Sequence, residues 1–147
     1  MNKIQVESYI LTFVQFLCAV FFFFFALSTP LGLISIILIT VAIANALWAV
    51  FTMHIGNFRF QPIPKEEIIL ITSGPYRFSR HPMYGSVLLA MLGVAISMDT
   101  WFGYAAWCIL FINLYIKLRF EEKLLLEKFS EYKEYMKRTK KILPFLW

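Results

Sequence analysis

The chain has 147 residues, of which 60% are hydrophobic, and its mean hydropathy is +0.69, whereas an average soluble domain contains roughly 45–50% apolar residues. The net charge of +5 does not indicate nucleic-acid binding, because the basic residues are interspersed with acidic ones, as on solvated helix faces. The two cysteines and two histidines are not clustered, so we expect no metal site. Composition therefore excludes an ordinary soluble domain and indicates a polytopic membrane protein, with residues 1–147 as one domain.

Four apolar stretches follow one another and predict an all-α fold with four transmembrane helices. We place these spans at about residues 9–27, 31–53, 82–98 and 100–117. A bilayer core about 30 Å thick requires about 20 helical residues, so the third stretch is short for a span. Pro82 is expected to begin that helix, because the N–H that proline lacks has no partner in a first helical turn anyway.

The charges predict the orientation of these spans. All fourteen Lys and Arg residues lie on the side opposite the two short turns that connect spans one to two and three to four. The positive-inside rule places this charged side, with both termini and segments 54–81 and 118–147, in the cytoplasm. We expect the C-terminal segment to form an amphipathic helix there. The composition is typical of a bacterial protein, so we expect the inner membrane, with the site facing the cytoplasm.

Two segments at the cytoplasmic face carry more functional groups than topology requires. GPYRFSRHPMYG (residues 74–85) precedes the third span, and KLRFEE (residues 117–122) follows the fourth. Because spans three and four form a hairpin, both segments lie at the same membrane face. Together they offer a helix N-terminus for an anion, tyrosine rings for a cation, and glutamates for an amine or hydroxyl groups. S-adenosylmethionine combines these groups and is a candidate ligand. Topology alone explains Arg77 and Arg80.

Several short motifs then occur in a fixed order. They are Gly74-Pro75-Tyr76, Arg80-His81-Pro82-Met83-Tyr84, Glu121-Glu122, Tyr132, Tyr135, Arg138 and Pro144. In this order, over about residues 57–147, they resemble the isoprenylcysteine carboxyl methyltransferase family and its phospholipid methyltransferase relatives. The combination is specific, because all of these motifs are present and occur in the same order.

The resemblance implies a cofactor pocket for S-adenosylmethionine over the cytoplasmic hairpin. The positions that match cofactor-binding residues are Gln61, Ile68, Ile69, Leu70, Ile71, Tyr76, His81, Pro82, Met83, Tyr84 and Glu121. Either Lys117 or Arg119 matches a basic residue that faces the substrate, and the sequence leaves this choice open. Arg119, Glu121 and Glu122 are the candidate catalytic residues.

The expected reaction is methyl transfer to a lipid-borne or otherwise apolar acceptor, with carboxyl O-methylation of an isoprenylcysteine-like molecule as the leading reaction. A carboxylate is already ionised at neutral pH and requires no general base. A phospholipid or other amine is the alternative acceptor, and Glu122 or His81 would then remove its proton. A second alternative is a non-enzymatic membrane module that binds anionic lipid or a partner protein. The expected partners are the bilayer and a lipid-like or prenylated small substrate, with no obligate protein partner.

Overall fold

The structure is a computed structural model that describes residues 3–53 and 69–142. Its longer helices are α1 (Lys3–Ser28), α2 (Leu33–Met53), α3 (Pro82–Met98) and α4 (Trp101–Lys128), and two short helical segments are η2 (Gly74–Arg77) and α5 (Tyr132–Arg138). Within these described ranges the only β-type pairing is an isolated bridge between Ser79 and Lys140. The prediction of an all-helical protein is confirmed.

In the part of the chain that the structure describes, three helices are long and apolar enough to cross a membrane, namely Val6–Ser28, Leu33–Met53 and Trp101–Lys128. They correspond to the first, second and fourth predicted spans. Large apolar side chains cover their outer faces; Phe51, for example, is 79% exposed and Leu27 73%. Such exposure is unfavourable in water and suits contact with lipid. α3 is also apolar but has only 17 residues, a length of about 26 Å at ~1.5 Å per residue.

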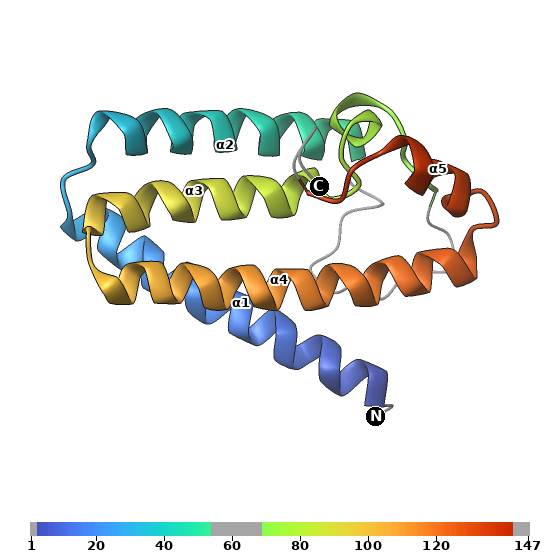
Figure 1. Cartoon of the computed structure of the whole chain (residues 1–147), viewed down its shortest axis with the longest axis horizontal. Helices are drawn as coiled ribbons and strands as arrows, with labels where there is room; N and C mark the ends of the chain where they lie inside the picture. Colours follow the sequence, from blue (N-terminus) through green and yellow to red (C-terminus); the bar gives the residue numbers. More distant parts are fainter. Residues whose placement is uncertain (1–2, 54–68, 143–147) are drawn as a thin grey trace.

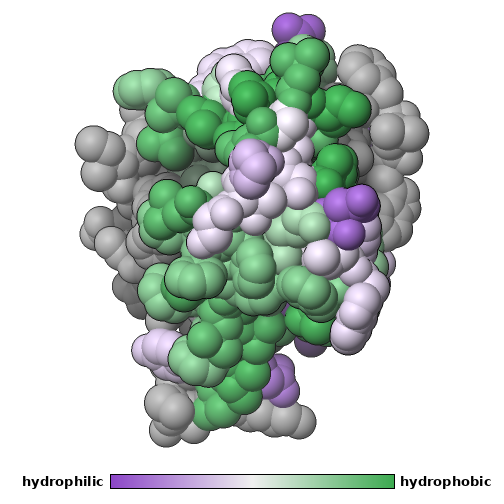
Figure 2. Space-filling model, turned by 90° about the vertical axis from the view of Figure 1, so that its left-hand side faces the viewer, coloured by the Kyte–Doolittle hydropathy of each residue, from purple (hydrophilic) through white to green (hydrophobic). Residues whose placement is uncertain are grey.

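The four long helices run alternately up and down. α2 and α3 lie side by side, α3 also packs against α4, and α1 crosses α4 at an angle (Figure 1). Two short turns, between α1 and α2 and between α3 and α4, lie at one end of this arrangement. That end is largely hydrophobic in the space-filling view (Figure 2). The opposite end carries η2, the start of α3, the end of α4 and α5, and it therefore holds most of the polar motifs.

Local sequence explains the hairpin between α3 and α4. Asp99 ends α3 in a left-handed conformation, with φ of 45°, which Asp tolerates better than most residues. The Thr100 hydroxyl then caps α4 by accepting a hydrogen bond from the Gly103 N–H, at 3.3 Å. The hairpin fixes the start of α3 and the end of α4 at the same end of the bundle, as the sequence predicts.

Small residues allow α2 and α3 to approach closely. Ser35 is buried on α2, and a Cβ added to Gly93 would lie 3.0 Å from its carbonyl oxygen. Nearer the polar end, Asn45 Nδ2 donates to the Ser86 hydroxyl at 2.8 Å and to the Pro82 carbonyl at 3.1 Å. Close van der Waals packing at small side chains and interhelical hydrogen bonds are the main interactions that hold helices together in a membrane. This contact positions the start of α3.

The C-terminal segment is helical, as expected, but it is not a single helix. α4 continues without interruption from the apolar stretch through Lys128. A break at Phe129 follows, and then the seven-residue α5. Beyond α5 the chain pairs with the segment before α3: Arg80 N–H donates to the Lys140 carbonyl at 2.8 Å and His81 N–H to the Lys141 carbonyl at 3.0 Å. These tertiary hydrogen bonds hold the segment against the bundle.

Candidate active site

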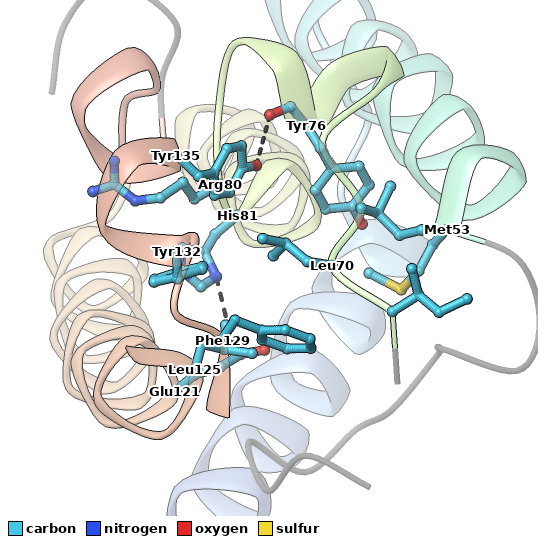
Figure 3. Close-up of a pocket in the computed structure, with 12 residues that line it drawn as sticks. Met53, Leu70, Tyr76, Arg80, His81, Glu121, Leu125, Phe129, Tyr132 and Tyr135 are labelled. Carbon is cyan, nitrogen blue, oxygen red and sulfur yellow. Dashed lines mark hydrogen bonds and ion pairs between the residues drawn. The ribbon is translucent and has the colours of Figure 1, made fainter. Parts of the chain in front are cut away.

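A pocket opens at the polar end of the bundle. Its walls come from the end of α2, the segment before η2, the start of α3, the last turns of α4, and α5 (Figure 3). The lining residues are Met53, Ile69, Leu70, Ile71, Tyr76, Arg80, His81, Glu121, Leu125, Phe129, Tyr132 and Tyr135. Segments distant in sequence therefore form one cavity with an apolar wall and a few polar groups.

The turn at Gly74 presents Tyr76 to this pocket. Gly74 has φ of +57°, a left-handed conformation that glycine adopts without steric cost, and a Cβ there would lie 2.5 Å from the Thr52 hydroxyl oxygen. Pro75 comes next, in the first turn of η2, where a backbone N–H has no partner within the helix, so the proline costs no hydrogen bond. From α5, the Tyr135 hydroxyl donates to the Tyr76 carbonyl at 2.6 Å. The turn is thus held from both α2 and α5.

His81 lies between two adjacent glutamates of α4, Glu121 and Glu122. Its Nδ1 is 3.7 Å from Oε2 of Glu121, and its Nε2 is 3.7 Å from Oε1 of Glu122. Both separations exceed hydrogen-bond length, so these are electrostatic contacts. The His81 ring also stacks on Tyr84, with centroids 5.3 Å apart and an angle of 9°, and the Tyr84 hydroxyl donates to Glu121 Oε2 at 2.9 Å. An imidazole, a carboxylate and a phenol therefore meet at one side of the pocket.

Arg80 has a different role from the one that the sequence suggested. Its Nε donates to Glu122 Oε1 at 2.6 Å, with both side chains buried. Its Nη1 donates to the carbonyls of Met136 and Thr139. Topology alone does not explain Arg80, because the guanidinium joins the start of α3 to α4 and to the C-terminal segment. Arg77, in contrast, is exposed.

The structure brings most of the predicted cofactor residues together. Ile69, Leu70, Ile71, Tyr76, His81 and Glu121 line the pocket. A second, adjoining pocket is lined by Pro82, Met83 and Tyr84, and it shares Tyr76, His81 and Glu121 with the first. Gln61 and Ile68 lie outside the described residues.

The remaining predicted residues lie elsewhere. Glu122 lines neither pocket and pairs with Arg80. Arg119 is exposed on α4 and also lines neither of them. Lys117 is only 2% exposed, and its Nζ donates to Gln15 Oε1 on α1 at 2.7 Å. Of the two basic candidates, only Lys117 is thus held inside the bundle.

Sequence reasoning did not include Tyr132 and Tyr135 in the site. Both are buried and line the pocket. Both belong to the ordered motifs of the sequence, and their spacing of three residues places them on the same face of a helix. These were the available signals. Met53, Leu125 and Phe129, which also line the pocket, carry no such signal, because apolar residues near the end of a membrane helix are common.

Two phenol groups of the pocket are buried without a hydrogen-bond partner among the described residues, namely the hydroxyls of Tyr76 and Tyr132. Burial raises the pKa of both phenols far above the ordinary value, and nearby glutamate charges raise these pKa values further. Both hydroxyls therefore remain protonated and can donate hydrogen bonds. Buried polar groups usually have partners, so these two hydroxyls indicate a polar ligand.

The donors and walls of this pocket suit S-adenosylmethionine. Ile69 and Leu70 provide apolar surface for a flat base, the Glu121 carboxylate can accept hydrogen bonds from hydroxyl or amine groups, and tyrosine rings can face a positive centre. The two unpartnered phenols add hydrogen-bond donors. The residues present thus fit the group that the sequence motifs imply.

The fold is that of an α-helical membrane protein, with a candidate ligand pocket at one end of its bundle. The model of the phospholipid methyltransferase family matches residues 27–132. The chain therefore belongs to this family of integral-membrane methyltransferases, as the sequence motifs predict.

A curated relative is the cobalt-zinc-cadmium resistance protein CzcN of Cupriavidus metallidurans. It is 36% identical to this chain over 78 residues, which cover 52% of the chain and 36% of the relative. The chain thus aligns with little more than a third of the length of that protein.

Proposed function

We propose that the protein transfers a methyl group from S-adenosylmethionine to a lipid-borne or otherwise apolar acceptor. The observation that carries this proposal is the pocket itself, because it joins the apolar segment at Ile69, the Tyr76 turn, His81 and Glu121 at the polar end of an apolar bundle. An acceptor with a long apolar tail can remain in the membrane while its polar end reaches this site.

Each wall of the pocket has a role in this proposal. Ile69, Leu70 and Ile71 would hold the adenine by apolar contact, and Glu121 would bind hydroxyl or amine groups. Tyr76 and Tyr84 would offer their ring faces to the positive sulfur centre. S-adenosylmethionine supplies an electrophilic methyl group when bound. The residues of the chain act by orienting the two reactants and by excluding water, which is catalysis by proximity.

The leading acceptor is a carboxylate of an isoprenylcysteine-like molecule. Such a carboxylate is ionised at neutral pH, since an α-carboxyl has a pKa of about 3.3–3.7. No residue then has to remove a proton. The site needs a positive charge near the acceptor, and Lys117 and Arg119 are the candidates that the sequence offers.

A lipid amine is the second candidate, and one observation favours it. His81 lies at the pocket, 3.7 Å from both Glu121 and Glu122, and imidazole is the side chain that acts most often as a general base in enzymes. The two acceptors differ in pH dependence. Methylation of an amine should fall steeply below neutral pH, whereas methylation of a carboxylate should change little.

We also propose four membrane spans, with α3 as the third and with both termini and the pocket in the cytoplasm of a bacterial cell. The turns at the other end contain Asp99 as their only charged residue, in agreement with the positive-inside rule. Cysteine accessibility from each side of the membrane tests this orientation. Labelling of Asp99→Cys from the cytoplasmic side would contradict it.

Titration calorimetry of the detergent-purified protein with S-adenosylmethionine tests the function. Binding is expected, with a loss of at least tenfold in His81→Ala and Glu121→Ala, since a hydrogen bond to a charged group contributes about 1.5–3 kcal/mol. The exposed Glu127→Ala is the matched control and should bind normally. Transfer of labelled methyl groups to a farnesylated cysteine or to phosphatidylethanolamine then identifies the acceptor.

The competing possibility is a non-enzymatic module that binds anionic lipid or a partner protein. It predicts no cofactor binding, strong salt dependence of vesicle binding, and no effect of His81→Ala. These three results together would contradict the proposed methyl transfer.

A further inference from the structure

Ser79 lies two residues before His81 and lines neither of the two pockets of the candidate site. Its side chain belongs to the segment between η2 and α3 and is only 2% exposed. A buried hydroxyl group usually has hydrogen-bond partners. For Ser79 these partners come from the C-terminal segment, residues 139–142, which runs from α5 back to the start of α3 (Figure 1).

The Ser79 hydroxyl joins the two segments. It donates to the Ile142 carbonyl at 2.8 Å, and the Lys141 carbonyl lies 3.1 Å away. The same oxygen accepts a hydrogen bond from the His81 N–H at 3.3 Å. One hydroxyl group therefore links the main chain of His81 to the C-terminal segment.

Main-chain hydrogen bonds complete this link on both sides of Ser79. The Lys140 N–H donates to the Phe78 carbonyl at 3.0 Å, and the His81 N–H donates to the Lys141 carbonyl at 3.0 Å. They belong to the isolated parallel bridge between Ser79 and Lys140. Because the pairing is so short, the Ser79 hydroxyl is a substantial part of it.

Ile142 anchors the C-terminal segment against α3. Its side chain is 5% exposed and belongs to the apolar core cluster, together with Leu88 of α3 and Leu114 of α4. The main chain is also close to α3, because a Cβ added to Gly85 would lie 3.1 Å from the Ile142 carbonyl oxygen. The segment that binds Ser79 is therefore itself fixed by the bundle.

The His81 ring depends on this main-chain support. Its Nε2 is buried without a hydrogen-bond partner among the described residues. The carboxylates of Glu121 and Glu122 remain 3.7 Å from the ring nitrogens, beyond hydrogen-bond length. Tyr84 stacks on one face of the ring. The position of the imidazole thus follows from this stacking and from the place of its main chain, which the C-terminal segment holds.

We propose that Ser79 is a positioning residue: by joining the C-terminal segment to the main chain of His81, it holds the imidazole at the pocket with Nε2 open to a ligand. The inference rests on the proposed function, in which His81 contributes to the cofactor site, and deepens it by adding residues 139–142 to that site. Without the hydroxyl group, the His81 N–H loses one acceptor and the Ile142 carbonyl loses its donor. The imidazole can then move to a neighbouring carboxylate, and small displacements of an orienting group have large effects in such sites.

NMR of the imidazole nitrogens in the detergent-purified protein without cofactor tests this position. The chain has two histidines, so His54→Gln, at a position outside the described residues, leaves His81 as the only imidazole. In this background Ser79→Ala should shift the nitrogen signals, because they respond to hydrogen bonding of the ring. It should also weaken S-adenosylmethionine binding about three- to tenfold, less than His81→Ala does.

Ser97→Ala is the matched control for Ser79→Ala. The Ser97 hydroxyl donates to Ser35 Oγ at 2.8 Å, so this variant also removes a hydroxyl that joins two segments, but at the other end of the bundle. The imidazole signals and the cofactor affinity should stay as in the wild type. Unchanged imidazole signals in folded Ser79→Ala, or an equal shift in Ser97→Ala, would overturn the inference.

Gly85→Ala separates positioning from stability. Its Cβ would lie 3.1 Å from the Ile142 carbonyl oxygen, so the C-terminal segment has to shift by a few tenths of an ångström while Ser79 is retained. Alanine also favours a helix more than glycine does, so the shift does not depend on a loss of stability. The imidazole signals should move in this variant too. If Ser79→Ala does not fold, Gly85→Ala decides, and unchanged signals there would contradict the positioning role.

The experiment also distinguishes this inference from the proposed function, because the NMR signals are recorded without S-adenosylmethionine. A protein that binds S-adenosylmethionine but whose imidazole signals do not respond to Ser79→Ala retains the proposed function and loses the inference. A protein whose signals respond as expected but that binds no S-adenosylmethionine retains the role of Ser79 in placing His81 and loses the methyl transfer.

Discussion

Arg80 and Glu122 form a buried ion pair across the site, with Nε 2.6 Å from Oε1 and side chains only 5% and 6% exposed. The two residues are 42 positions apart and come from the start of α3 and from α4. The same guanidinium donates to two carbonyls of the C-terminal segment. One side chain therefore fixes three walls of the pocket relative to one another.

The first prediction concerns this ion pair. Arg80→Met leaves the Glu122 carboxylate buried without its cation, and breaking a buried pair in this way costs about 3–5 kcal/mol. Unfolding of the detergent-solubilised protein by heat or denaturant measures the loss. Lys137→Met is the matched control, because Lys137 and Glu134 also lie 2.6 Å apart but are exposed, and such pairs contribute about 0–1 kcal/mol. Equal stabilities of the two variants would contradict the assignment of Arg80.

The second prediction distinguishes pocket tyrosines whose hydroxyl group serves ligand binding from one whose hydroxyl group stabilises the fold. Tyr76→Phe and Tyr132→Phe remove hydroxyls that have no partner among the described residues, so folding stability should stay equal or rise. Affinity for S-adenosylmethionine should fall about five- to tenfold, as expected for a net hydrogen bond of about 1 kcal/mol.

Tyr135→Phe is the control for these variants. Its hydroxyl donates to the Tyr76 carbonyl at 2.6 Å, so its removal should lower stability by about 1 kcal/mol. Calorimetry and thermal unfolding of the three variants give both quantities. If Tyr76→Phe and Tyr132→Phe lose stability but not affinity, the two hydroxyls do not serve the ligand.

The third prediction concerns alkaline pH. Burial raises the pKa of Tyr76, Tyr132 and Tyr135 in the folded protein far above the ordinary value of about 10. Above pH ~10 the unfolded chain releases these protons while the folded protein keeps them. The contribution of the three protonated phenols to the free energy of unfolding is therefore present below pH ~10 and is lost as the pH rises. The melting temperature should therefore fall above pH ~10, and the tyrosinate absorbance of these three residues should appear only together with unfolding. Normal ionisation of all tyrosines in the folded protein would contradict their burial.

The fourth prediction concerns the turn that presents Tyr76. Gly74→Ala places a Cβ at positive φ and within 2.5 Å of the Thr52 hydroxyl oxygen; the left-handed conformation alone costs about 1–2 kcal/mol. Stability and cofactor affinity should both decrease. Gly32→Ala is the control, since a Cβ there has no heavy atom within 4 Å. Similar losses in both variants would show that the Gly74 conformation is not required.

Much of the fold could be predicted because the bilayer restricts what a long apolar segment can do. Inside a bilayer the backbone N–H and C=O groups of an apolar segment have no water to bind, so the segment forms a helix. For this reason α1, α2 and α4 were recognisable from hydropathy. Pro82 marked the start of α3. The break after Lys128 was not recognisable. Residues 118–136 have helical periodicity throughout, and only the burial of Tyr132 and Tyr135 against the bundle turns the chain there.

The site was partly predictable for a related reason. His81 and Glu121 lie in short motifs, and the hairpin at Asp99 brings those motifs to one end of the bundle. Glu122 looks equivalent to Glu121 in the sequence. In the structure they differ by about 100° around α4, so Glu121 reaches the pocket and Glu122 faces Arg80.

The membrane class, the helical fold and the motif residues follow from the amino-acid sequence, because hydropathy and local spacing act over a few turns of chain. Which charged side chains are paired and which line the pocket depends on the tertiary fold. The contact of Lys117 with Gln15 is the clearest case, since the two residues are 102 positions apart. No periodicity links such positions, and only the crossing of α1 over α4 brings them together, because a buried ammonium must find an oxygen within reach.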